Sequence, residues 1–175
     1  MAIRKQTKYL TLCAMLSALG VLILGVGSMI EVLDVSVSVL ASLLCVYAVI
    51  EMGGAYPWLV FGVTSLLSLL LLPLKTPALF YALCLGFYPI LKEKLEKLPR
   101  LLSWVVKLAV FHACLGLLVL VLWLFLPAQL DMNGLQWMPI ALYALCLFCF
   151  VVYDVAMTKL ITFYLIRLRK RFRIK

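Results

Sequence analysis

The stretch from residue 35 to residue 74 carries a single charged side chain, Glu51, and this constrains the fold more than any other feature. The hydrocarbon core of a bilayer is about 30 Å thick, and a helix crosses it with about 20 residues. The stretch is therefore too long for one membrane span and fits two. Its middle, residues 51–57 with the sequence EMGGAYP, contains two glycines and a proline that favour a turn followed by a helix start. The sequence predicts two short spans that join there.

The rest of the chain has the same apolar character, with 67% hydrophobic and 13% charged residues. This composition is typical of an integral membrane protein and not of a soluble domain. No Ser- or Gly-rich linker divides the 175 residues, so we predict a single all-α transmembrane bundle over residues 1–175 with six spans. The predicted helices cover residues 9–30, 35–50, 57–72, 78–91, 101–126 and 140–166.

The distribution of basic residues predicts the orientation of these spans. Six spans place both termini on one side, and loops on the cytoplasmic side of a membrane carry an excess of lysine and arginine. Among the outer loops only Lys75 is basic, whereas a charged segment at 92–100 and a basic tail at 167–175 follow the fourth and sixth spans. We expect both termini to be cytoplasmic. The basic residues on that side are Arg4, Lys5, Lys8, Lys92, Lys94, Lys97, Arg100, Arg167, Arg169, Lys170, Arg171, Arg173 and Lys175.

Several classes of function find no support in the sequence. The net charge of +9 comes from helix ends, where it indicates membrane topology and contact with anionic lipid, so we expect no nucleic-acid partner. A single histidine, His112, precludes a multi-histidine metal site, and no Gly-rich phosphate loop is present. The six cysteines fall in apolar runs, and Cys146-x-x-Cys149 lacks a second ligand pair. We predict no metal, no cofactor, no disulfide and no enzyme activity.

Four ionisable residues fall within the predicted spans five and six. Charged groups at membrane depth tend to face the protein interior and to pair. Counted at 1.5 Å per residue from the cytoplasmic ends of their helices, Asp154 and His112 lie roughly 16 to 18 Å deep, and Lys159 and Lys107 about 10 Å. We predict a polar cluster of Lys107, His112, Asp154 and Lys159. Two roles stay open for it, namely an interior pair that sets helix register and a proton relay or coupling site.

Small residues one turn apart mark the first predicted span. Ala14 and Ala18 are four residues apart, and Gly20, Gly25 and Gly27 follow. Such spacing lets a second helix approach closely in a membrane, where lipid gives no hydrophobic force for association. The partner helix can belong to the same bundle or to another membrane subunit, and the sequence leaves both open.

The layout of the whole chain resembles the substrate-binding S components of energy-coupling factor (ECF) transporters, or an orphan member of that type. The shared features are the length, six spans, cytoplasmic termini, the Ala14-x-x-x-Ala18 spacing, and a Gly-rich approach to the third span in GGAYPWLVFGVTSLLSLLL. The resemblance implies that Ala14 and Ala18 dock on a transmembrane T subunit, which works with a pair of ATPases. It also implies that a vitamin- or micronutrient-type small molecule binds on the outer side, near Glu31, Asp34, Lys75 and the loop at 127–139.

An alternative from another class is a non-transporting membrane scaffold of the MreD type, a small multi-span partner protein in cell-envelope assembly. Its size and span count are similar. In both cases we expect a multi-pass protein of the bacterial plasma membrane. Co-purifying partners would separate the two hypotheses, because a T subunit with paired ATPases indicates transport and cell-wall synthesis proteins indicate a scaffold.

Overall fold

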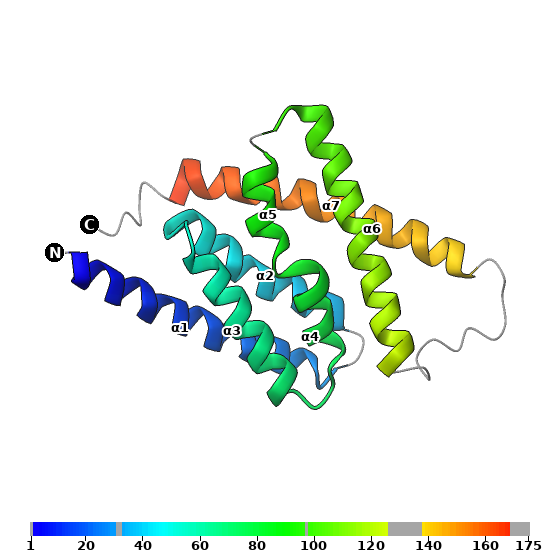
Figure 1. Cartoon of the computed structure of the whole chain (residues 1–175), viewed down its shortest axis with the longest axis horizontal. Coiled ribbons are helices and arrows are strands. Elements are labelled where there is room, and N and C mark those ends of the chain that lie inside the picture. The colour runs from blue at the N-terminus through cyan, green and yellow to red at the C-terminus, as the bar shows by residue number, and fades with distance from the viewer. Residues whose placement is uncertain (1, 31–32, 97, 126–137, 169–175) are drawn as a thin grey trace. The chain divides into compact units, whose positions relative to one another are not determined.

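The computed structural model describes residues 2–30, 33–96, 98–125 and 138–168, and every regular element in these ranges is helical (Figure 1). The chain consists of two compact units, residues 1–121 and 122–175, with the boundary inside one long helix. The predicted all-α class is therefore confirmed for the described residues. Glu31, residues 126–137 and residues 169–175 lie outside them, and so does most of the predicted loop at 127–139 and of the predicted tail at 167–175.

Three consecutive helices form the centre of the first unit: α1 (Ala2–Gly27), α2 (Asp34–Glu51) and α3 (Tyr56–Leu71). They pack side by side and alternate in direction. Cys13 in the first half of α1 contacts Met52, the residue after α2 ends, and Tyr56, the first residue of α3. The chain turns between α2 and α3 at Gly53 and Gly54, both with φ of +60°. Glycine adopts this conformation without steric cost, which explains the position of the break in the long apolar stretch.

One face of α1 packs against α2 and α3 through small side chains. Cys13, Ser17, Gly20 and Gly27 are all buried along this face. A Cβ atom at Gly20 would lie 2.9 Å from Cγ2 of Thr64, and one at Gly27 would collide with Val37. The glycines therefore allow a close approach of the helices, as small residues commonly do in membrane bundles.

The predicted helix at 78–91 is interrupted in the structure. A short helix α4 (Thr76–Phe80) continues as the π-helical turn η2 (Tyr81–Leu85), and a bend separates them from α5 (Tyr88–Leu95). The wide turn closes where the amide of Gly86 donates to the carbonyl of Tyr81 at 2.7 Å. Pro89, which has no amide hydrogen to continue the helical ladder, is the second residue of α5.

Two long helices complete the described chain: α6 (Arg100–Phe125) and α7 (Met138–Phe163), the latter extended by the π-helical turn η4 (Tyr164–Leu168). Within the described ranges, four helical stretches are long and apolar enough to cross a membrane, and α3 is apolar but shorter. The helices are thus compatible with the predicted membrane location. The four stretches are Gln6–Gly27, Asp34–Glu51, Leu101–Val121 and Ala141–Ile166.

Candidate functional site

The small-residue pair of α1 lies on the face that is not used for packing in the first unit. Ala14 and Ala18 are exposed, whereas Cys13 and Ser17, one residue before each, are buried. Large apolar side chains flank the pair and are also exposed, among them Met15, Leu19 and Leu22. The structure therefore presents a strip on which another helix could approach to the backbone of α1.

Asp34 and Lys75, two of the predicted substrate-binding residues, lie at the same end of the first unit. The hydroxyl of Ser38 is 2.7 Å from the carbonyl oxygen of Asp34 and 2.9 Å from that of Pro77, so it joins the beginnings of α2 and α4. Asp34 is half-buried, and the exposed Lys75 donates from Nζ to the carbonyl of Leu72 at 2.6 Å. The third predicted residue, Glu31, lies outside the described residues, as do residues 127–137 of the predicted loop at 127–139.

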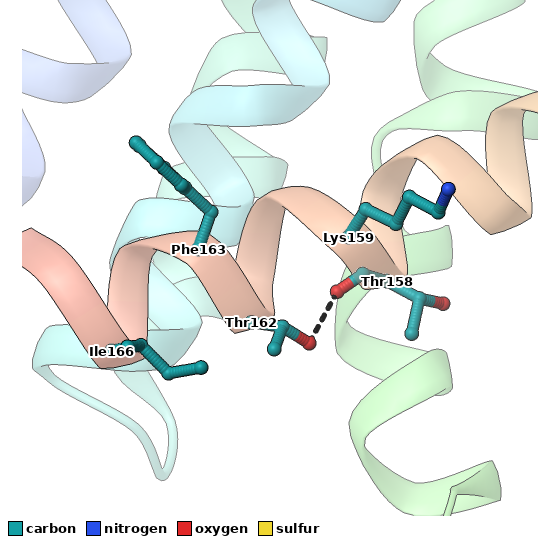
Figure 2. Close-up of a pocket in the computed structure, with 5 residues that line it drawn as sticks. All are labelled: Thr158, Lys159, Thr162, Phe163 and Ile166. Carbon is teal, nitrogen blue, oxygen red and sulfur yellow. Dashed lines mark hydrogen bonds between the residues drawn. The ribbon is translucent and has the colours of Figure 1, made fainter.

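An open hollow of about 460 Å³ lies along one side of the C-terminal part of the second unit. Figure 2 shows five of the side chains that line it, on successive turns of α7 and η4. At 100° per residue the five positions fall within about 140° of the helix circumference, so they form one strip. They are Thr158, Lys159, Thr162, Phe163 and Ile166, all exposed.

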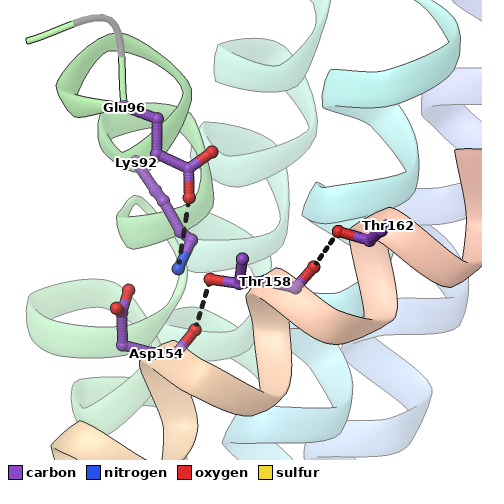
Figure 3. Close-up of polar contacts among 5 residues, drawn as sticks. All are labelled: Lys92, Glu96, Asp154, Thr158 and Thr162. Carbon is purple, nitrogen blue, oxygen red and sulfur yellow. Dashed lines mark hydrogen bonds and ion pairs between the residues drawn. The ribbon is translucent and has the colours of Figure 1, made fainter.

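Asp154 and Lys159, which the sequence analysis placed in one cluster, lie on different sides of α7. Five residues turn a helix by about 140° beyond one full revolution, and Asp154 is 3% exposed whereas Lys159 is exposed. Next to Asp154 the threonine hydroxyls donate to carbonyls one turn back, from Thr158 to Asp154 at 2.9 Å and from Thr162 to Thr158 at 2.8 Å (Figure 3).

Lys107 and His112 also differ in their surroundings on α6. Lys107 is 5% exposed and places Nζ 5.5 Å from the ring centroid of Trp104, a cation–π contact. His112 is exposed, and its Nδ1 lies 2.7 Å from the carbonyl oxygen of Leu108 on its own helix. The two residues belong to the first unit and Asp154 to the second, so their predicted proximity to Asp154 stays a prediction.

Lys92 is a buried cation that the sequence analysis missed. It was assigned to a charged cytoplasmic segment, yet it lies in α5 and is 1% exposed. Its Nζ lies 3.5 Å from Oε1 of Glu96, one turn on, which is 44% exposed (Figure 3). Tyr88 and Leu95, four residues before and three after Lys92, are buried too. This helical spacing was visible in the sequence and could have indicated that Lys92 shares the inward face of α5.

The interior of the first unit contains hydroxyl groups that the sequence analysis also missed. Thr64 and Ser65 in α3 are buried, and their hydroxyl oxygens have no hydrogen-bond partner in the described part of the chain. Ser17 contributes another buried hydroxyl, 3.5 Å from the carbonyl oxygen of Val60. In the same core Cys45 Sγ lies 3.3 Å from the hydroxyl of Tyr81. The helices therefore meet through short polar groups as well as apolar ones.

The described residues contain no group of three or more His, Cys, Asp or Glu side chains that could hold a metal ion. Comparison with models of protein families, with curated proteins and with solved structures gives no match to this chain. The functional argument consequently depends on the chain's own geometry, in particular on the exposed strip of α1.

Proposed function

We propose that this chain is a multi-pass membrane protein with six spans and cytoplasmic termini that serves as the substrate-binding subunit of an ECF-like uptake transporter. The observation that carries the proposal is the exposure of Ala14 and Ala18. An exposed small-residue pair on an apolar helix is suited to close approach by a helix of another membrane subunit. The sequence has no phosphate-binding loop, so partner ATPases supply the energy.

The proposed role in substrate binding is supported by the position of Asp34 and Lys75, which lie at the same end of the first unit. Ser38 holds the two chain segments together there, and an acid and a base at one end of an apolar bundle can orient a small polar molecule. In the proposed topology this end faces the outside, because α1 runs outward from a basic N-terminal segment.

The docking half is tested by substituting the two alanines. We expect the double variant Ala14→Leu/Ala18→Leu to fold normally and to lose most of its co-purifying T subunit and paired ATPases, because leucine keeps the partner helix away from the backbone of α1. The matched control is Ala109→Leu/Ala113→Leu, which changes two exposed alanines at the same spacing on α6. Partners are identified by mass spectrometry after mild solubilisation from native membranes.

Two outcomes would contradict the transporter proposal. Equal partner recovery in both double variants would show that the strip of α1 is not the docking surface. Recovery of cell-wall synthesis proteins, with no T subunit and no ATPase, would favour the scaffold of the MreD type instead. A small molecule that stays bound through purification and is lost in Asp34→Ala would strengthen the assignment of the outer site.

A further inference from the structure

Two sulfur atoms meet where α1 passes the turn between α2 and α3. The thiol of Cys13 donates to the thioether of Met52, and the atoms Sγ and Sδ are 3.7 Å apart. The carbonyl oxygen of Tyr56 lies 3.8 Å from the same Sγ. Three atoms that can bind a metal ion, from three separate parts of the chain, therefore gather around Cys13.

The backbone holds the second sulfur in place. Met52 directly follows the last residue of α2, and its amide donates to the carbonyl of Ala48 at 3.0 Å. The glycine turn that comes next, with φ of +60° at both positions, leads the chain to Tyr56, the first residue of α3. The methionine is thus fixed by the end of one helix and by the turn into the next.

The surroundings of the sulfur pair are apolar and partly closed. Cys13 is 5% exposed and belongs to the core of the first unit, against which Met52 and Tyr56 pack. Tyr9, one turn before Cys13 on α1, packs its ring against that of Tyr56 with the centroids 5.3 Å apart. Met52 is half-buried, so a small ion can reach the sulfur atoms from its side. An uncompensated charge is costly in such surroundings.

These properties favour a soft monovalent metal ion. Thiolate and thioether sulfurs are soft ligands that suit Cu(I), so no group of His, Cys, Asp or Glu side chains is needed. When Cu(I) binds, the thiol releases its proton to the solvent and a copper–sulfur bond forms. The charges of the thiolate and the ion then cancel. Zn²⁺ on the same two sulfurs would leave one positive charge in apolar surroundings and would lack about two of its usual ligands.

The separation of the two sulfur atoms already fits a shared metal ion. Zinc–thiolate bonds are about 2.3 Å long, and bonds from Cu(I) to sulfur are of similar length. Two such bonds across the 3.7 Å between Sγ and Sδ would meet at roughly 110°. We propose that Cys13 and Met52 bind one Cu(I) ion beside the carbonyl of Tyr56. The inference depends on the packing of α1 against α2 and α3 and not on the proposed transport role.

The test measures Cu(I) binding by the purified full-length protein. A Cys146→Ser/Cys149→Ser background removes the two cysteines of α7 that could bind copper by themselves. In this background, competition with a chromogenic Cu(I) chelator should report a single tightly bound ion per chain. We expect Cys13→Ser and Met52→Leu each to weaken binding by about 100-fold or more, because loss of an outer-shell partner alone costs about 10- to 100-fold.

A matched control separates the sulfur pair from an isolated thiol. Cys45→Ser removes another buried cysteine of the first unit, whose Sγ lies 3.3 Å from the hydroxyl of Tyr81, and should keep the affinity. Equal losses in Cys45→Ser and Cys13→Ser would overturn the proposal in favour of binding by thiols in general. Unchanged affinity in Met52→Leu would overturn the shared site, and so would copper binding that requires the two cysteines of α7.

A spectroscopic measurement identifies the methionine ligand without changing the sulfur pair. The background protein, labelled with selenomethionine and loaded with Cu(I), should show one selenium neighbour at bonding distance in copper X-ray absorption. Met52→Leu should lose this neighbour, whereas Met157→Leu, a change at a buried methionine of the second unit, should keep it. A copper site without selenium would contradict the bond to Met52. Retention of Zn²⁺ as strong as that of Cu(I) would contradict the selection of a monovalent ion.

Discussion

Ser38 illustrates how single polar groups act within this apolar chain. Its hydroxyl lies within hydrogen-bond distance of two carbonyl oxygens, those of Asp34 in its own helix and Pro77 in α4. The contact with Pro77 spans a sequence separation of 39 residues and holds α4 beside the start of α2. The residue has no charge and no motif, so nothing in the sequence marked it as a link.

We expect Ser38→Ala to lower the free energy of unfolding by about 0.5 to 1.5 kcal/mol, because a buried interhelical hydrogen bond is lost. Ser36→Ala is the control, since Ser36 is an exposed serine in the same helix. Unfolding is followed by helical circular dichroism in mixed micelles. Equal stabilities for the two variants would show that the bond between Ser38 and Pro77 contributes nothing.

The ionisable residues show which part of a residue's position a sequence can predict. Depth follows from the rise of a helix, and the sequence analysis used it to match Asp154 with His112 and Lys159 with Lys107, and so to predict one cluster of four. Direction around the helix was not considered. The two residues on each helix are five positions apart, which places them about 140° apart beyond a full turn. Burial then separates Asp154 from Lys159 and Lys107 from His112.

At the scale of elements, glycines decide how closely the helices of the first unit approach. Gly27 ends α1 directly against Val37 of α2, whereas a Cβ atom at Gly25 would meet no heavy atom within 4 Å. The sequence contains both residues in one GVG tripeptide and does not distinguish them. The packing of α2 leaves no room for a Cβ atom at Gly27, whereas Gly25 has open space.

The two glycines should respond to alanine in opposite ways. Gly27→Ala forces its Cβ atom against Val37 and should cost about 1 to 3 kcal/mol, as overpacking commonly does. Gly25→Ala should leave the stability unchanged or raise it by up to about 1 kcal/mol, because alanine favours the helix. Thermal unfolding of the two variants in the same detergent compares them directly. A destabilised Gly25→Ala with an unaffected Gly27→Ala would contradict the helix packing described for α1 and α2.

The segment that was expected to be one helix shows a limit of hydropathy at the element scale. Residues 78–91 are apolar enough for a span, yet the π-helical turn η2 and the bend before Pro89 divide them. Gly86 packs here against Phe61 and Tyr81. The interruption therefore depends on a tertiary contact with α3 as well as on the local proline.

At the scale of the whole molecule, the proposed six-span topology makes a direct prediction. Reporter fusions at the N-terminus and at the C-terminus should both be cytoplasmic, and a reporter inserted at Leu74, between α3 and α4, should be external. The physical reason is the excess of lysine and arginine near both ends of the chain and the single Lys75 on the opposite side. Opposite locations of the two termini would show an odd number of spans and exclude the proposed topology.

The sequence alone predicted the all-α class that the described residues have, because its long apolar stretches are compatible with helices in a membrane. It also indicated the break at 51–57, where glycines and a proline act locally on the backbone. The tertiary structure decided which face of each helix packs against its neighbours. On α1, Gly20 and Gly27 pack against other helices, whereas Ala14 and Ala18 are exposed. Among the lysines, Lys92 is buried and Lys159 is exposed. Composition and spacing are properties of one segment, whereas burial of a face depends on which other segments pack against it.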